Sequence, residues 1–82
     1  MPYIDKKQRS TAAECPLTPG ELNYAITRLL DFYIAEKGAD YTQMNAAMGA
    51  VESAKQEFYR RVVVPYEEHK RRVNGDVYTV AK

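Results

Sequence analysis

Residues 18–40 read TPGELNYAITRLLDFYIAEKGAD, and this stretch contains the start signal, the apolar stripe and the stop signal of one helix. Thr18 and Glu21 have the spacing of a capping box, in which each side chain accepts a backbone N–H of the first turn. Gly38 is a suitable C-terminal cap for this helix. The stretch therefore predicts a helix from about Pro19 to Lys37. Its apolar residues recur at three- and four-residue spacing: Leu22, Ala25, Ile26, Leu29, Leu30 and Tyr33.

A second helix is expected directly after this one. Asp40 is a suitable N-cap, and Gln43 stands three residues later. The loop between the two helices is short, which favours an antiparallel hairpin. The apolar stripe of the second helix consists of Met44, Ala47, Met48, Val51, Ala54, Phe58 and Val62.

Pro65 interrupts the second helix. It has no N–H to donate to the carbonyl of Arg61, and its ring disfavours helical geometry at Val64. We therefore expect the helix to kink or stop at Pro65 and to resume over Glu67–Val73. Asn74-Gly75 then reads as a terminator.

The predicted fold class is all-α: an antiparallel helical hairpin with a proline-kinked second helix. Three segments follow from this interpretation. Residues 1–17 form an irregular N-terminal arm, residues 18–74 form the helical hairpin domain, and residues 75–82 form a C-terminal tail. Within that tail, Val77, Tyr78 and Val80 form either a short strand or a contact with another subunit.

Two amphipathic helices cannot bury all the apolar surface of this chain. With 82 residues and 45% hydrophobic content, the chain builds only a small core by itself. Phe32, Tyr33 and Phe58 fall on more than one face of their helices. We therefore predict a homo-oligomeric helix bundle, a dimer or higher. The alternative is a monomer whose two tails fold back over the hairpin.

Charge and cysteine usage indicate the compartment and the partners. The single cysteine, Cys15, excludes an intrachain disulfide, and no apolar run fits a signal peptide or a membrane span. We expect a cytoplasmic protein with no membrane partner. The formal net charge is +1, and Glu67 and Glu68 lie inside the most basic stretch, so DNA is an improbable partner.

The sequence offers no set of catalytic or metal-binding residues. His69 is the only histidine, and no second histidine stands at the spacing of a zinc site. Cys15 has no CxxC partner, and Glu52 and Glu57 are five residues apart, so they do not share a helix face. We therefore predict no catalytic residue, no metal, no cofactor and no enzymatic activity.

Residues 58–72, FYRRVVVPYEEHKRR, combine cations, aromatic rings and proline within about four helical turns. Guanidinium groups bind phosphate or carboxylate, and tyrosine rings stack on flat bases. An anionic, nucleotide-like molecule offers both features. The alternative is that the cations pair with Glu57, Glu67 and Glu68 on a solvated face. The candidate ligand-binding residues are Tyr59, Arg60, Arg61, Tyr66, Lys70 and Arg72.

Four strings of this sequence carry a resemblance to a known family: MPYI at the start, GELNYAITRLL (20–30), EFYRRVVVPYEEHKRR (57–72) and NGDVY (74–78). They resemble a family of small uncharacterised proteins found in bacteria and bacteriophages. The resemblance covers most of the chain except residues 6–16. It implies a compact helical accessory protein of a bacteriophage or prophage, and it transfers no catalytic residue.

Two functions of different class remain open at this point. The first is a non-catalytic, oligomeric helical protein that binds an anionic, nucleotide-like molecule in a host bacterium. The second is a protein-interaction module, in which the small-residue face of the second helix or the apolar tails bind a host or virion protein.

Overall fold

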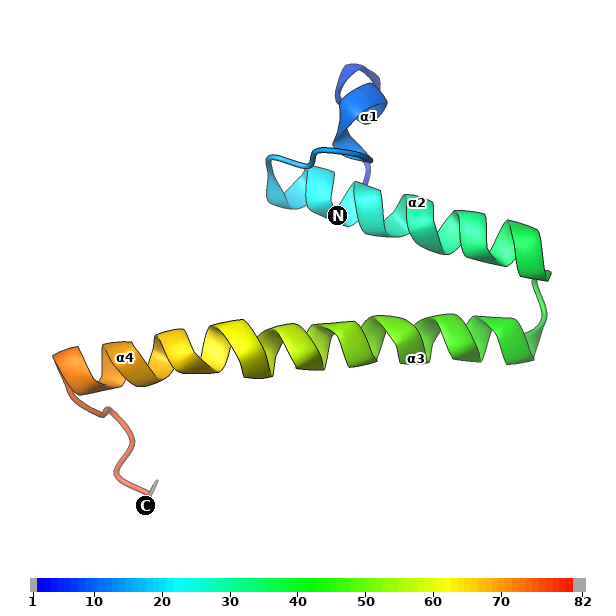
Figure 1. Ribbon diagram of the computed structural model, residues 1–82. Helices are drawn as coiled ribbons and strands as arrows, with labels where there is room; N and C mark the ends of the chain where they lie inside the picture. Colours follow the sequence, from blue (N-terminus) through cyan, green and yellow to red (C-terminus); the bar gives the residue numbers. More distant parts are fainter. Residues whose placement is uncertain (1, 81–82) are drawn as a thin grey trace. The chain divides into compact units, whose positions relative to one another are not determined.

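A computed structural model describes residues 2–80, and these residues are mostly helical and contain no strand. The all-α prediction is therefore confirmed. Two compact units divide the chain, the N-terminal unit (Met1–Ala47) and the C-terminal unit (Met48–Lys82), with the boundary inside α3. The elements, shown in Figure 1, are α1 (Lys6–Ala12), α2 (Pro19–Lys37), α3 (Tyr41–Phe58), the π-helical turn η1 (Tyr59–Val63) and α4 (Val64–Asn74).

Helix α2 has the predicted boundaries. The Thr18 hydroxyl accepts the backbone N–H of Glu21 at 3.1 Å, as expected of the N-cap. The Glu21 carboxylate does not complete the capping box at Thr18, because it accepts the N–H of Leu17 at 3.0 Å. Gly38 ends the helix with a φ of 104°, a conformation that residues with a Cβ rarely adopt.

The N-terminal segment is not irregular throughout, so that prediction is wrong over Lys6–Ala12, which form α1. Asp5 and Gln8 make a complete capping box: the Asp5 carboxylate accepts backbone N–H groups of the first turn, and the Gln8 side chain accepts the N–H of Asp5 at 3.1 Å. The helix carries no apolar stripe, so periodicity alone does not reveal it. The Asp-x-x-Gln spacing is the signal that identifies its start.

Helix α1 packs against α2 within the N-terminal unit. The Gln8 amide donates to the Glu21 carboxylate at 2.8 Å, and the Arg9 guanidinium lies 5.7 Å from the centre of the Tyr24 ring. Ala12 is completely buried. Helix α1 is thus joined to the first turns of α2 by one hydrogen bond and one cation–π contact, and it contributes one small buried side chain.

Helix α3 begins as predicted. The Asp40 carboxylate accepts the N–H of Gln43 at 2.8 Å. The Gln43 side chain does not return to Asp40, because its oxygen accepts the Tyr33 hydroxyl at 2.9 Å.

The helix does not stop at Pro65. Val64 keeps helical angles, φ −60° and ψ −49°, so the prediction that proline moves it out of the helical region is wrong. The irregularity is instead η1, on the N-terminal side of the proline, where the N–H of Val64 donates to the carbonyl of Tyr59 five residues earlier. The wider turn gives the proline ring room that a regular α-helix denies it.

The end of α4 agrees with the Asn74-Gly75 terminator, because Gly75 has a φ of 89°. The Asp76 carboxylate then accepts the N–H of Tyr78 at 2.9 Å, a local turn rather than a strand. The strand alternative for this tail is therefore wrong up to Val80. The alternative contact with another subunit stays a prediction.

Burial is minimal in both units. Only three described residues are buried, all of them alanines of the N-terminal unit: Ala12, Ala25 and Ala47. The C-terminal unit has no buried residue among those described. Neither unit therefore has a core made of large apolar side chains.

Candidate functional site

All six predicted ligand-binding residues lie in the C-terminal unit, close to the π turn. Tyr59, Arg60 and Arg61 belong to η1, and Tyr66, Lys70 and Arg72 belong to α4. Each of the six is exposed.

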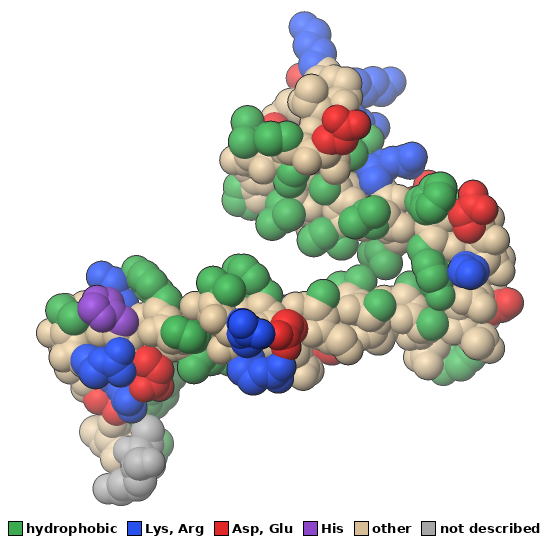
Figure 2. All heavy atoms as spheres, in the orientation of Figure 1, with side chains coloured by type: hydrophobic (Ala, Val, Ile, Leu, Met, Phe, Trp, Pro, Cys, Tyr) green, Lys and Arg blue, Asp and Glu red, His purple; other side chains and the backbone are tan. Residues whose placement is uncertain are grey.

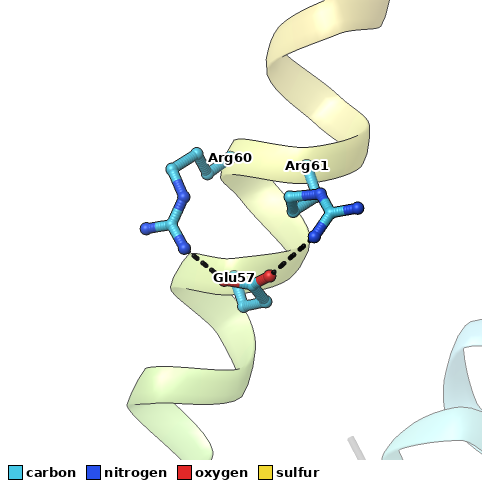
Figure 3. A network of polar contacts seen from close by, with 3 residues as sticks. All are labelled: Glu57, Arg60 and Arg61. Carbon is cyan, nitrogen blue, oxygen red and sulfur yellow. Dashed lines mark hydrogen bonds and ion pairs between the residues drawn. The ribbon is translucent and has the colours of Figure 1, made fainter.

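Arg60 and Arg61 share one carboxylate. Figure 3 shows the two guanidinium groups reaching the side chain of Glu57 from either side. Arg61 donates to one oxygen at 3.5 Å, and Arg60 pairs with the other. Exposed pairs at this spacing stabilise a helix by only about 0.3–0.5 kcal/mol each. The contacts match the alternative predicted above, in which the arginines pair along a solvated face.

Two further cations also interact within α4. The Lys70 ammonium lies 5.8 Å from the centre of the Tyr66 ring. Arg71 pairs with Glu68 at 2.7 Å. The Tyr66 ring is therefore already in contact with a cation of its own helix, which reduces the surface that it offers to a nucleobase.

An open hollow of about 480 Å³ lies between α4 and the C-terminal tail. It brings together only two of the six predicted residues, Tyr59 and Lys70. Three carboxylates share the hollow with these cations and rings, which weakens its attraction for an anion. The hollow is lined by Tyr59, Glu67, Glu68, Lys70, Arg71, Asn74, Gly75, Asp76, Val77 and Tyr78.

The tail residues of this hollow were not among the predicted site residues. Tyr78 joins Tyr59 in the lining because the turn at Asp76 holds the tail near α4. The signal was available in the NGDVY string, where glycine ends the helix and aspartate accepts a backbone N–H two residues later.

The remaining titratable groups make no further cluster. Among residues 2–80, no three His, Cys, Asp or Glu side chains gather closely enough to hold a metal ion. The Glu52 pKa is lowered, first by the hydrogen bond from Gln56 at 3.0 Å and then by Lys55. Cys15 is an exposed free thiol. None of the helices among residues 2–80 has the length and apolar character that crossing a bilayer requires.

A second surface of the C-terminal unit is apolar. Along its helix, large side chains are exposed to an extent unusual for a folded domain; Met48 is 71% and Phe58 is 59% exposed. Figure 2 shows hydrophobic side chains recurring along this helix, with charged side chains gathered towards its C-terminal end. We call this surface the apolar stripe and define it as Met48, Val51, Phe58, Val62, Tyr66 and Val73.

These features define a small all-α protein with two arginines paired to Glu57 and an exposed apolar stripe. Residues 1–77 match the model of a family described as Domain of unknown function (DUF6899), and the chain belongs to that family. No curated protein and no solved structure gives a match.

Proposed function

We propose that this chain is a non-enzymatic interaction module, which binds another helix through the apolar stripe. The observation that carries the proposal is the absence of any buried side chain larger than alanine among residues 2–80, together with the exposure of the whole stripe. Full burial of one valine, methionine or phenylalanine side chain contributes about 1.5–3 kcal/mol. The five such residues of the stripe supply on the order of 10 kcal/mol towards association, before the entropic cost of binding is subtracted.

The polar contacts support this choice over the anionic-ligand function. Arg60 and Arg61 are already paired with Glu57, and Lys70 already contacts Tyr66. A ligand at these residues has to compete with each of these contacts. A partner at the apolar stripe displaces only water, except at Tyr66, where it also competes with the Lys70 contact.

Native mass spectrometry of the full chain, purified gently from expressing cells, tests the proposal. We expect the chain in a complex, either with copies of itself or with another protein. Phe58→Asp puts a charge into the stripe and is expected to abolish that complex. Ser53→Asp is the matched control, because Ser53 lies on the opposite side of the same helix and its replacement adds the same charge. A chain that is monomeric and without a partner, or a complex that Phe58→Asp leaves intact, contradicts the proposal.

The binding of an anionic, nucleotide-like molecule is the second candidate function. The specific observation in its favour is that Tyr59 and Lys70 line one hollow together with Tyr78 and Arg71. Isothermal titration with cyclic and linear nucleotides is expected to show binding that Lys70→Ala weakens. Arg72→Ala is the control, because Arg72 lies on the same helix outside the hollow. The absence of heat with every nucleotide contradicts this candidate.

The biological setting also belongs to the proposal. The resemblance described above implies a bacterial or bacteriophage accessory protein that acts in the host cytoplasm. An antiparallel hairpin of α2 and α3, assembled into a homo-oligomeric bundle, is the arrangement that we propose for it, since short loops favour antiparallel neighbours.

A further inference from the structure

We infer that the partner of the apolar stripe is a second copy of this chain, paired antiparallel along the helix from Met48 to Val73. This inference rests on the proposed function and names the partner of the same surface. It follows from the spacing of the stripe, the π turn, the length of α2 and the distribution of charge.

The stripe has the spacing of a coiled-coil seam. Met48, Val51, Lys55, Phe58 and Val62 follow one another at alternating steps of three and four residues, the a and d positions of a heptad repeat. In this assignment Met48, Lys55 and Val62 are a positions, and Val51 and Phe58 are d positions. The stem of Lys55 can pack in the seam while its ammonium reaches water.

The π turn brings two further apolar side chains into the seam beyond Val62. In a regular helix the next seam positions are Pro65, His69 and Arg72, which are poor contacts for a partner helix. The extra residue accommodated in η1 moves each seam position forward by one. The seam then continues through Tyr66, Lys70 and Val73, and all three lie on α4.

Helix α2 is too short to cover this portion of the seam as well as α3, and the described part of the tail does not cover it. Helix α2 has 19 residues and α3 has 18, so an α2 packed along α3 has no residues left for α4. Within the C-terminal unit the tail does not cover the stripe either: Val77 is 86% exposed and Val73 is 64% exposed.

Charge selects the antiparallel orientation. The segment 48–58 carries two glutamates and one lysine, a net charge of −1. The segment 59–74 carries five lysine or arginine residues and two glutamates, a net charge of +3. A parallel pair of copies places the two positive segments side by side, whereas an antiparallel pair places each positive segment beside a negative one.

The seam positions of the two copies also match one another in an antiparallel register. In antiparallel coiled coils, an a position of one helix faces a d position of the other. One register satisfies this rule in every layer: residue 48 faces 73, residue 51 faces 70, residue 55 faces 66, and residue 58 faces 62 of the second copy. Lys55 then approaches the Tyr66 ring of the second copy, a favourable cation–π pair.

Disulfide trapping in the full chain tests the orientation and the register. Cys15 is first replaced by serine because its thiol is exposed. Met48→Cys and Val73→Cys are then made in separate chains, and the two chains are mixed and oxidised. We expect a covalent dimer in the mixture and none in either chain alone. Two copies of residue 48 lie about 37 Å apart in the antiparallel pair, far beyond the reach of a disulfide.

A second pair of variants, Val51→Cys with Lys70→Cys, probes a different layer of the same register. It keeps the test decisive if one variant of the first pair does not fold. Covalent dimers from both mixtures support the inference. A covalent dimer from Met48→Cys alone shows a parallel pair and overturns it, as does a dimer in sedimentation that neither mixture traps. A chain that forms only a complex with a different protein, sensitive to Phe58→Asp, overturns this inference but leaves the proposed function standing. A solitary chain overturns both.

Discussion

Replacement of Pro65 by alanine tests the two roles that we assign to the π turn. The turn makes room for the proline ring, and it brings Tyr66 and Val73 into the seam. Alanine restores an N–H at position 65 and removes the ring that conflicts with a regular helix. We expect η1 to relax into α-helix. The residues of α4 then rotate about the helix axis by nearly one residue step, on the order of 100°, relative to those before the turn.

Two opposite effects follow from this rotation. Alanine is better than proline in a helix interior by about 3 kcal/mol, and the π turn already relieves part of that cost, so we expect a local gain of about 1–3 kcal/mol. At the same time Tyr66 and Val73 leave the seam, while His69 and Arg72 enter it. Each of the two copies loses two apolar contacts, at about 1.5–3 kcal/mol each, so the dimer is weakened by about 6–12 kcal/mol, or on the order of 10⁴-fold or more in Kd.

Circular dichroism and sedimentation equilibrium on the same samples measure both effects. We expect Pro65→Ala to retain or raise the helical signal at high concentration, while its dimer dissociates at concentrations where the parent chain remains paired. A matched control combines Pro65→Ala with deletion of Val63, which removes the extra residue and returns Tyr66 and Val73 to the seam. Its expected result is recovered dimerisation. A Pro65→Ala chain that pairs as tightly as the parent refutes the argument from the π turn.

Three smaller predictions concern local features. Thr18→Ala removes the N-cap of α2 and is expected to cost about 1 kcal/mol in urea unfolding, whereas Thr27→Ala, within the same helix, changes little. Ala12→Leu overpacks the one fully buried position among residues 2–80, which lies on the helix that packs against α2; it is expected to cost about 1–3 kcal/mol, and unchanged stability contradicts that packing. The lowered Glu52 pKa means that its contribution to helix stability is fully present above the ordinary value of 4.5 and is lost as the pH falls through the folded pKa, so Glu52→Gln is expected to flatten the helical signal over that acid range.

The sequence predicts the helices where local chemistry determines them. Thr18, Gly38 and Asp40 each act on a backbone group within a few residues, and the boundaries that they predict are found in the structure. Helix α1 is not predicted by apolar periodicity, because a short helix with one small buried residue shows none. The spacing of Asp5 and Gln8 indicates the start of α1 in the same way as Thr18 indicates the start of α2.

The proline shows where such reasoning fails. The rule that Pro65 lacks a donor and crowds the preceding turn is correct, but it does not say which of several accommodations the chain adopts. A kink, a stop and a π turn all remove the conflict. The outcome depends on the residues on both sides, and here Tyr59–Val63 widen while Val64 stays helical.

The sequence could predict which candidate residues lie near one another along the helix, but not which of them line the same hollow. The sequence correctly places Arg60 and Arg61 beside Glu57, because residues three and four apart meet on a helix face. It cannot show that Tyr59 and Lys70 share a hollow while Tyr66 and Arg72 lie outside it. That division depends on the path of the tail after Gly75, which no helical periodicity describes.

The contacts within the helix of the C-terminal unit are too weak to stabilise it by themselves. Most helical stability in proteins arises from the packing of an amphipathic face, and isolated helices are marginal in water. Its ion pairs at Glu52, Glu57 and Glu68 are exposed and contribute little each. Because the unit buries no described side chain, the formation of its helix and the covering of its stripe are energetically one event. In the function that we propose, the residues that bind the partner also stabilise the helix, and a single polar substitution in the stripe is expected to weaken both.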